Sequence, residues 1–322
     1  MAVKDKTSCF LFPGQGAQYP GMALDLRENS RGVKNLFELA SDIMGKDMGA
    51  LLGDSGGEAL KRTDAAQPAV TLANLAAAVY LEERGIRPAG CAGFSLGEYA
   101  ALVSAGVIGP EDCFRLVKAR GEAMLAAADR IREISPGREA PGMAAVIGLE
   151  PEQVLALIAE WSAAGLSGLY PANINSPRQL VVAGTAGALA LAEEKFKAAG
   201  ARRFVRLQVS GPFHSPLIAG AAESFAPVLE GVPFKDPVIP LYSNVSGGPV
   251  ASGAEAKKFA LAQITSPVRW IEEEGAVNRQ EGLEAVLETG PGTVLRGLWK
   301  DSGSKIPCHA AGTEADIKLL QN

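Results

Sequence analysis

The segment Gly93-Phe94-Ser95-Leu96-Gly97 has the G-x-S-x-G pattern of a serine nucleophile held at a sharp turn between a strand and a helix. The pattern often arises by chance, so its surroundings decide between this role and that of an ordinary turn serine. A run of small residues (90–94) predicts a strand before the serine, and residues 96–105 predict a helix after it. The N–H of Leu96 would then lie at a helix N-terminus, where the dipole stabilises an oxyanion. We therefore predict that Ser95 is a nucleophile that accepts an acyl group.

A serine nucleophile needs a general base, usually histidine, and the chain has only two histidines. His214 lies in a segment rich in glycine and proline (210–216) after a predicted strand, and catalytic groups often lie in such loops. His309 is predicted to be a partly exposed loop residue, so His214 is the predicted base. The acidic residues between Ser95 and His214 lie on predicted solvent-facing surfaces. A backbone carbonyl could therefore orient the imidazole in place of a carboxylate.

Arg120 is the most informative charged residue. It lies on a predicted helix that begins at Pro110, and its neighbours three and four positions away are all apolar: Leu116, Val117, Ala123 and Met124. The side chain is therefore predicted to point inward, where a guanidinium needs an anionic partner. That partner is either a protein carboxylate, the commoner outcome, or a substrate carboxylate held by both arms of the guanidinium. The sequence leaves both alternatives open.

A glycine-rich loop follows the first predicted strand (8–12) and reads Pro13-Gly14-Gln15-Gly16-Ala17-Gln18. As a G-x-G-x-x-G dinucleotide motif it fails at Tyr19, where the third glycine should stand, and no Walker A motif is present. Glycines can instead bring backbone N–H groups close to a ligand. The Gln15 N–H could thus be a second oxyanion donor beside that of Leu96.

The composition excludes several classes of function. The 322 residues carry a formal net charge of −5, which gives no support for binding nucleic acid or anionic lipid. No signal peptide is expected, and the alanine-rich stretch (65–81) contains Gln67 and Asn74 and predicts a buried helix rather than a membrane span. Four scattered cysteines and two histidines make a metal site unexpected. Reduced thiols predict a cytoplasmic protein.

The order of predicted elements indicates an α/β fold with a parallel sheet. Further strands are predicted at 238–242 and 285–288, with helices at 36–52 and 67–83. Residues 143–209 read strand, helix, strand, strand, helix, strand, which is the order of a ferredoxin-like unit. A stretch rich in proline and glycine (135–141) predicts a boundary. We expect a large α/β-hydrolase-like domain of residues 1–139 and 209–322, with residues 140–208 forming an inserted ferredoxin-like α+β subdomain.

Motifs along nearly the whole chain resemble those of malonyl-CoA:acyl-carrier-protein transacylases. The first half contains Phe12-Pro13-Gly14-Gln15-Gly16-Ala17-Gln18, Gly93-Phe94-Ser95-Leu96-Gly97-Glu98, Arg120-Gly121 and Asn173-Ile174-Asn175-Ser176-Pro177-Arg178-Gln179. The second half contains Pro212-Phe213-His214-Ser215, Tyr242-Ser243-Asn244-Val245, Gln263 with Pro267-Val268-Arg269-Trp270, and Glu288-Thr289-Gly290-Pro291-Gly292. So many motifs in one order make the resemblance specific.

The resemblance implies a role for each candidate residue. Ser95 would carry a malonyl ester, His214 would be its base, and Arg120 would bind the malonyl carboxylate. The N–H groups of Gln15 and Leu96 would form the oxyanion hole. The supporting residues would be Gln263, whose main-chain carbonyl would orient the histidine, together with Asn173 and Phe213. The implied partners are malonyl-CoA and acyl carrier protein in fatty acid biosynthesis, with a coenzyme A thioester as substrate and no bound cofactor.

Three features depart from the family pattern, one of them being Ile218 at a position where methionine is common. Position 94 is phenylalanine where many bacterial members have histidine, and the segment 129–141 is somewhat long and has no assigned role. Other readings of the sequence remain. They are a separate acyltransferase of a polyketide synthase, a serine thioesterase with water as acceptor, and a catalytically silent docking subunit. The complete set of Ser95, His214 and Arg120 argues against the last.

Overall fold

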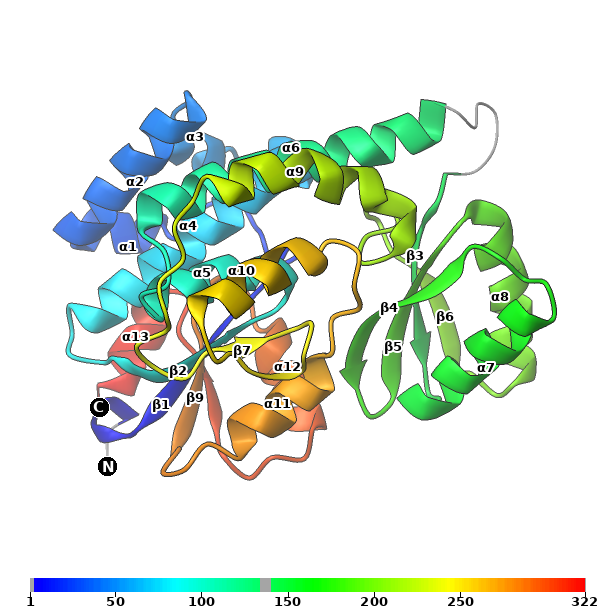
Figure 1. The fold of residues 1–322 in the computed structure, drawn as a ribbon. Helices are drawn as coiled ribbons and strands as arrows, with labels where there is room; N and C mark the ends of the chain where they lie inside the picture. Colours follow the sequence, from blue (N-terminus) through cyan, green and yellow to red (C-terminus); the bar gives the residue numbers. More distant parts are fainter. Residues whose placement is uncertain (1–2, 134–139, 322) are drawn as a thin grey trace.

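Two four-stranded sheets organise the chain in a computed structural model that describes residues 3–133 and 140–321 (Figure 1). One sheet is parallel, with the strand order β10-β9-β1-β2, and the other is antiparallel, with the order β4-β5-β3-β6. The chain therefore has the mixed α/β architecture with a parallel sheet that the sequence predicts. Residues 134–139, within the predicted boundary and the unassigned segment 129–141, lie outside the described residues.

The parallel sheet positions the loops that carry the predicted chemistry. Its strands are β1 (Ser8–Phe12), β2 (Pro88–Gly93), β9 (Ala285–Glu288) and β10 (Cys308–Ala310). All five residues of the central strand β1 are buried, as expected for a strand covered on both faces. Phe12 pairs with Gly93, so β1 and β2 end side by side. The glycine-rich loop and the Ser95 turn therefore leave the sheet at the same edge.

Two glycines permit these loops to approach each other closely. A Cβ on Gly14 would lie 2.4 Å from the Phe94 carbonyl oxygen, and a Cβ on Gly97 would lie 2.0 Å from the Phe12 carbonyl oxygen. Both clashes involve backbone atoms, which cannot move without shifting the strands. The glycines of both motifs are therefore required by packing as well as by turn geometry.

Helices cover both faces of the parallel sheet (Figure 1). Phe10 and Phe12 of β1 point into the larger core, which contains residues of α2 (Arg31–Met44), α4 (Thr63–Glu82), α5 (Glu98–Ser104), α6 (Pro110–Glu133), α9 (Ala219–Glu230) and α10 (Gly253–Ala262). Cys9 and Leu11 point to the opposite face, against α11 (Trp270–Asn278) and α12 (Val294–Asp301). This alternation follows from the two-residue period of a strand. Residues 65–78 of α4 are all buried, which confirms the buried helix, and no helix of the described residues could span a membrane.

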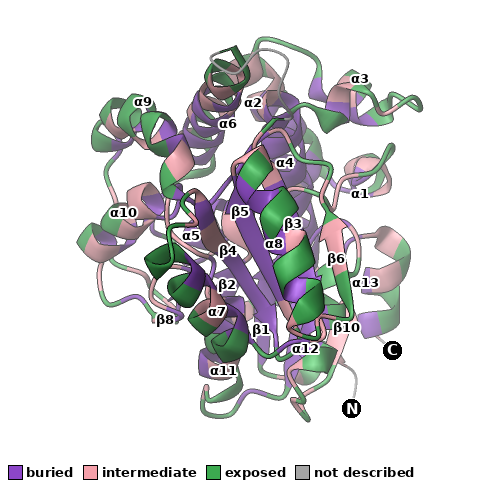
Figure 2. Ribbon diagram, turned by 90° about the vertical axis from the view of Figure 1, so that its right-hand side faces the viewer, coloured by how far each residue is buried: buried purple, intermediate pink, exposed green. Residues whose placement is uncertain are grey.

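The antiparallel sheet has its own core. It contains β3 (Gly142–Ile147), β4 (Leu169–Ser176), β5 (Gln179–Gly184) and β6 (Arg203–Arg206), with α7 (Pro151–Ala163) and α8 (Ala186–Ala198) in the predicted order. Trp161 and Phe196 pack edge to face in the core between the helices and the sheet, and Figure 2 shows the outer faces of both helices exposed. Asn173 of β4 forms an isolated parallel β-bridge with Val268, which lies in the C-terminal half of the chain just before α11. This bridge joins the antiparallel sheet to the segment that leads into a helix covering the parallel sheet.

Three local expectations were wrong. The single helix predicted at 36–52 is two helices, α2 and α3 (Met48–Gly53), because Gly45 ends α2 in the left-handed conformation. The strand predicted at 238–242 is reduced to β7 (Tyr242–Ser243), paired with β8 (Gly248–Pro249), although Leu241 bridges Cys91. His309 lies in β10 rather than in a loop. The remaining elements are α1 (Leu24–Asn29), α13 (Glu314–Leu320) and four short 3-10 turns, Val3–Asp5, Ala59–Lys61, Ser95–Gly97 and Pro216–Ile218.

Candidate active site

Ser95 and His214 share an unusual backbone conformation. Among the described residues, only three that are not glycine have positive φ angles: Ala23 at 60°, Ser95 at 51° and His214 at 57°. Residues with side chains rarely adopt this left-handed region, and such strain is concentrated at functional sites. Ser95 adopts it at the end of β2, where the chain turns abruptly into a 3-10 turn and then α5. This is the sharp turn that the sequence pattern predicts.

The two side chains meet although 119 positions separate them in the sequence. The Ser95 Oγ lies 2.7 Å from the His214 Nε2, and the His214 Nδ1 lies 2.9 Å from the main-chain oxygen of Gln263. A carbonyl oxygen can only accept, so Nδ1 must carry the proton and Nε2 must accept from the Ser95 hydroxyl. This tautomer is the one that a general base requires.

The Gln263 carbonyl replaces the carboxylate of a conventional triad. Gln263 is the C-cap residue of α10, where the last carbonyls of a helix have no partner within it. His214 Nδ1–H occupies one of these free acceptors at the negative end of the helix dipole. The arrangement thus orients the imidazole without a buried acid, as the sequence allowed.

His214 is only 4% exposed, and its surroundings favour the neutral ring. Burial and then the positive charge of Arg120 lower the pKa of His214 from 6.5 to about 4, although the carbonyl hydrogen bond acts in the opposite direction. The imidazole is therefore unprotonated at neutral pH and available to accept a proton.

This lowered pKa predicts how acylation of Ser95 depends on pH. Protonation of the base abolishes its function, so the rate should fall only as the pH approaches the pKa of about 4. Rapid-quench measurements of acyl-enzyme formation at pH 5.5 and pH 7.5 should agree within about twofold. A histidine with the ordinary pKa of 6.5 would instead lose about tenfold between these values, and that result would contradict the assignment.

Arg120 is buried in α6 with 1% exposure and, among the described residues, forms no ion pair with a protein carboxylate. Its Nη1 donates to Gln67 Oε1 at 2.9 Å, and its Nη2 donates to Gln263 Oε1 at 3.0 Å. The same Nη2 lies 3.4 Å from the Ser95 Oγ, while Nε has no hydrogen-bond partner in the described parts of the chain. The internal salt bridge, the commoner alternative, is thus not formed. Two neutral amides hold the guanidinium beside the Ser95 hydroxyl and, among the described residues, no carboxylate pairs with its charge.

Two backbone N–H groups remain free to stabilise an oxyanion. The Ser95 N–H is occupied, because it donates to Asn244 Oδ1 at 2.6 Å. Within the described part of the chain, the N–H groups of Gln15 and Leu96 donate to no protein acceptor. Their loops leave adjacent strands, as the register of β1 and β2 requires.

One pocket, with a volume of about 300 Å³, is lined by most of the predicted site residues. Residues of the large core and of the antiparallel sheet both line it: Gln15, Phe94, Ser95, Arg120, Met124, Met143, Asn173, Asn175, Gln179, Val181, Leu207, Val209, Phe213, His214, Val294 and Leu298. Leu96 and Gln263 do not line it, but Leu96 directly follows Ser95, and Gln263 contacts both Arg120 and His214. The described residues contain no group of three metal-ligating side chains.

The sequence model of the acyl transferase domain matches residues 9–313 of the chain. The chain belongs to the acyl transferase family. It is 37% identical to the malonyl CoA-acyl carrier protein transacylase of Bacillus subtilis (strain 168) over 312 residues, which cover 96% of this chain and 95% of that protein. The Escherichia coli (strain K12) protein of the same name is 39% identical over 292 residues, covering 90% and 91%.

Solved structures of the acyl transferase family agree with this assignment. An acyl carrier protein S-malonyltransferase from Vibrio cholerae superposes with a TM-score of 0.90 at 37% identity, covering 98% of this chain and 100% of that one. A malonyl-transacylase in complex with the acyl-carrier protein of a type II PKS superposes with a TM-score of 0.89 at 36% identity, covering 98% and 99%. The resemblance found in the motifs is therefore confirmed as membership of the malonyl-CoA:acyl-carrier-protein transacylase family.

Phe94, which departs from the pattern of many bacterial family members, lines the pocket and packs edge to face on Trp270 with a centroid distance of 5.3 Å. An apolar side chain suits this position because its neighbours on that face belong to the smaller core around Trp270 and Trp299. The segment 129–141, to which no role was assigned, also has a contact in its described part. Arg132 donates to the carbonyl of Ser210, a residue four positions before His214.

Two residues of the acyl transferase site were not predicted. Gln67 holds Arg120, but the sequence presented it only as a polar interruption of an alanine-rich helix. Asn244 holds the backbone of Ser95, but it stands in a motif to which we assigned no role. A polar amide inside a fully buried helix was the available signal for Gln67, because a buried amide needs a partner. Nothing local indicated the partner of Asn244.

Proposed function

We propose that this protein transfers a malonyl group from malonyl-CoA to the phosphopantetheine thiol of acyl carrier protein, through a Ser95 acyl-enzyme, in fatty acid biosynthesis. One observation carries the proposal. The Ser95 hydroxyl lies within hydrogen-bond reach of a neutral histidine and beside a buried arginine with no carboxylate partner among the described residues. The proposed nucleophile, its proposed base and the arginine proposed to bind an anionic acyl group thus line one pocket.

In the first half-reaction, His214 Nε2 takes the Ser95 proton as Oγ attacks the thioester carbon. The N–H groups of Gln15 and Leu96 would donate to the oxyanion of the tetrahedral intermediate. The carbon–sulfur bond then breaks, and His214 returns the proton to the departing coenzyme A thiolate. The products are malonyl-Ser95 and free coenzyme A.

The second half-reaction repeats these steps with a different thiol. The phosphopantetheine thiol of acyl carrier protein gives its proton to His214 and attacks the Ser95 ester. Collapse of the intermediate releases malonyl-acyl carrier protein and returns the proton to Ser95. No group other than the coenzyme A thioester and the carrier thiol is consumed, so no bound cofactor is needed.

Arg120 would bind the malonyl carboxylate and so select a dicarboxylic acyl group. Its planar guanidinium can donate two parallel hydrogen bonds to a carboxylate. The amides of Gln67 and Gln263 orient it without neutralising it. Asn173 and Phe213 line the same pocket and would support the acyl chain.

The fold supports a division of the chain into the expected domains. The antiparallel sheet takes its four strands in the spatial order second, third, first, fourth, which agrees with a ferredoxin-like subdomain of residues 140–208. Residues 1–139 and 209–322 would then form the α/β-hydrolase-like domain with Ser95 at the end of a parallel strand. A cytoplasmic location remains a prediction from four cysteines, all of them free thiols in the structure.

Intact-mass measurement tests the proposal. Mixing the protein with malonyl-CoA should add one malonyl group and release one equivalent of coenzyme A, and adding acyl carrier protein should move that group to the carrier. Steady release of coenzyme A without a carrier would instead indicate a thioesterase. Comparing carriers of fatty acid and polyketide systems in the same assay decides between the two pathways.

A further inference from the structure

The turn that carries Ser95 is clasped by a buried side chain that the mechanism above does not use. Asn244 is fully buried just after β7, and its Oδ1 accepts from the Ser95 N–H at 2.6 Å. Its Nδ2 donates to the Gly93 carbonyl at 2.7 Å. Gly93 and Ser95 lie on either side of Phe94, so one amide holds the backbone both before and after the turn.

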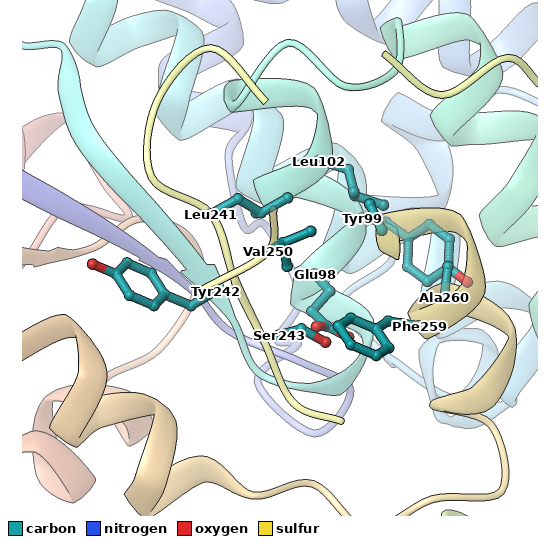
Figure 3. A pocket seen from close by; sticks show the side chains of 10 residues that line it. Glu98, Tyr99, Leu102, Leu241, Tyr242, Ser243, Val250, Phe259 and Ala260 are labelled. Atoms are coloured by element: carbon teal, nitrogen blue, oxygen red, sulfur yellow. The ribbon is translucent and has the colours of Figure 1, made fainter. Parts of the chain in front are cut away.

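Asn244 is itself fixed by glutamates from two helices. Its N–H donates to Glu98 Oε1 of α5 at 2.8 Å, and its Nδ2 donates to Glu273 Oε2 of α11 at 2.6 Å. Figure 3 shows the Glu98 side chain beside Ser243 in the wall of a small, largely apolar cavity. Neither carboxyl forms an ion pair within the described residues. Burial raises the pKa of Glu98 to about 8 and raises that of Glu273 well above its usual range.

Ser95 needs such support because its backbone φ of 51° is unfavourable for any residue with a side chain. Gln263 Nε2 also donates to the Ser95 carbonyl at 3.0 Å. Without the hydrogen bond from the Ser95 N–H, we expect the turn to relax and to carry the hydroxyl away from His214 Nε2. A misplacement of about 1 Å between reacting groups can lower a rate by about 100-fold. The hydrogen bonds of Asn244 to Ser95 and Gly93 therefore act on the geometry of the Ser95 hydroxyl and not on the substrate.

We propose that Asn244 is a positioning residue, which holds Ser95 in its strained conformation so that the hydroxyl stays aligned with His214. The inference rests on the proposed function, because it concerns the acylation of Ser95. It also explains why the oxyanion must be stabilised by Gln15 and Leu96, since the Ser95 N–H is already occupied by Asn244.

The first test measures acylation of Ser95 by malonyl-CoA in rapid-quench experiments. In Asn244→Leu, a side chain of similar shape without polar atoms, the rate at saturating malonyl-CoA should fall about 100-fold. The half-saturating malonyl-CoA concentration should stay within about threefold, because Asn244 does not line the pocket. Ser246→Ala, which changes the same loop but only bonds to Gly248, is the matched control and should acylate like the wild type.

A second pair of variants separates positioning from folding. Asn244→Asp keeps the acceptor for the Ser95 N–H but replaces the donor to the Gly93 carbonyl and to Glu273 Oε2 with a second acceptor. Combining it with Glu273→Gln restores a donor–acceptor pair between positions 244 and 273, whereas the bond to the Gly93 carbonyl remains lost. We expect the double variant to acylate at least about tenfold faster than Asn244→Asp alone.

The outcomes are distinct. Acylation of Asn244→Leu within threefold of the wild type, or a loss confined to the half-saturating concentration, overturns the inference. If Asn244→Leu does not fold, equal rates for Asn244→Asp and the double variant overturn it. If the wild type itself is not acylated by malonyl-CoA, the proposed function fails before the variants are compared.

Discussion

Replacing Ser95 with alanine is expected to lower malonyl transfer by at least about 10⁴-fold, because the transfer has no covalent route without the nucleophile. Intact-mass analysis should show no malonyl adduct on the variant at any time after mixing with malonyl-CoA. The fold should survive, since alanine has nearly the same backbone preferences and, in residues 3–133 and 140–321, the hydroxyl bonds only to His214 and Arg120. Arg120 keeps its two glutamine partners.

His214→Ala provides the comparison for this experiment. It leaves the hydroxyl in place but removes the group that accepts its proton, so slow labelling of Ser95 should remain detectable. If both variants unfold at temperatures close to that of the wild type, the losses of activity are due to the missing side chains and not to a damaged fold. A malonyl adduct on Ser95→Ala would place the nucleophile elsewhere and remove the proposed mechanism.

Replacing Arg120 with alanine is expected to lower kcat/KM for malonyl-CoA by at least about 100-fold, because hydrogen bonds to a charged group contribute about 1.5–3 kcal/mol each and two would be lost. Acetyl-CoA has no carboxylate for the guanidinium to bind. Its slower transfer should therefore change by less than about tenfold. The measured quantity is kcat/KM for malonyl-CoA divided by kcat/KM for acetyl-CoA, and this ratio should fall in the variant.

The matched control is Arg115→Ala on the same helix. Arg115 is exposed and pairs with Glu111, so replacing it with alanine should change kcat/KM for neither malonyl-CoA nor acetyl-CoA. Equal losses of malonyl and acetyl transfer in Arg120→Ala would contradict a role in selecting the acyl group. Arg120 would then act mainly through the position of Ser95 or the pKa of His214.

The three side chains that meet in the candidate site could be predicted because each is marked by its own neighbours in the sequence. Ser95 stands between two glycines and between a strand and a helix, and only two histidines compete for the role of base. The inward direction of Arg120 follows from its apolar helical neighbours. These are short-range patterns, and the regular geometry of helices and strands alone determines from them the direction in which a side chain points.

The contacts that hold these residues could not be predicted, because they join segments far apart in the sequence. Gln67 and Arg120 are 53 positions apart, and Asn244 and Ser95 are 149 apart. A helix buried on all sides, like α4, has no periodicity to indicate which residue faces the site. The length of the strand predicted at 238–242 was overestimated for a related reason. A run of apolar residues does not reveal how many of them will pair with a neighbouring strand.

The uncharged main-chain partner of His214 limits the chemistry that this site can perform. When the ring accepts a proton, no carboxylate in the described part of the chain is paired with it to balance the new charge, and the nearby guanidinium opposes that charge. Such a base suits leaving groups that depart readily as anions, and thiols, with a pKa of about 8.5, do so far better than amines. The enzyme should therefore exchange thioesters rapidly while leaving peptide bonds intact, a restraint suited to a catalyst that handles another protein as its acceptor.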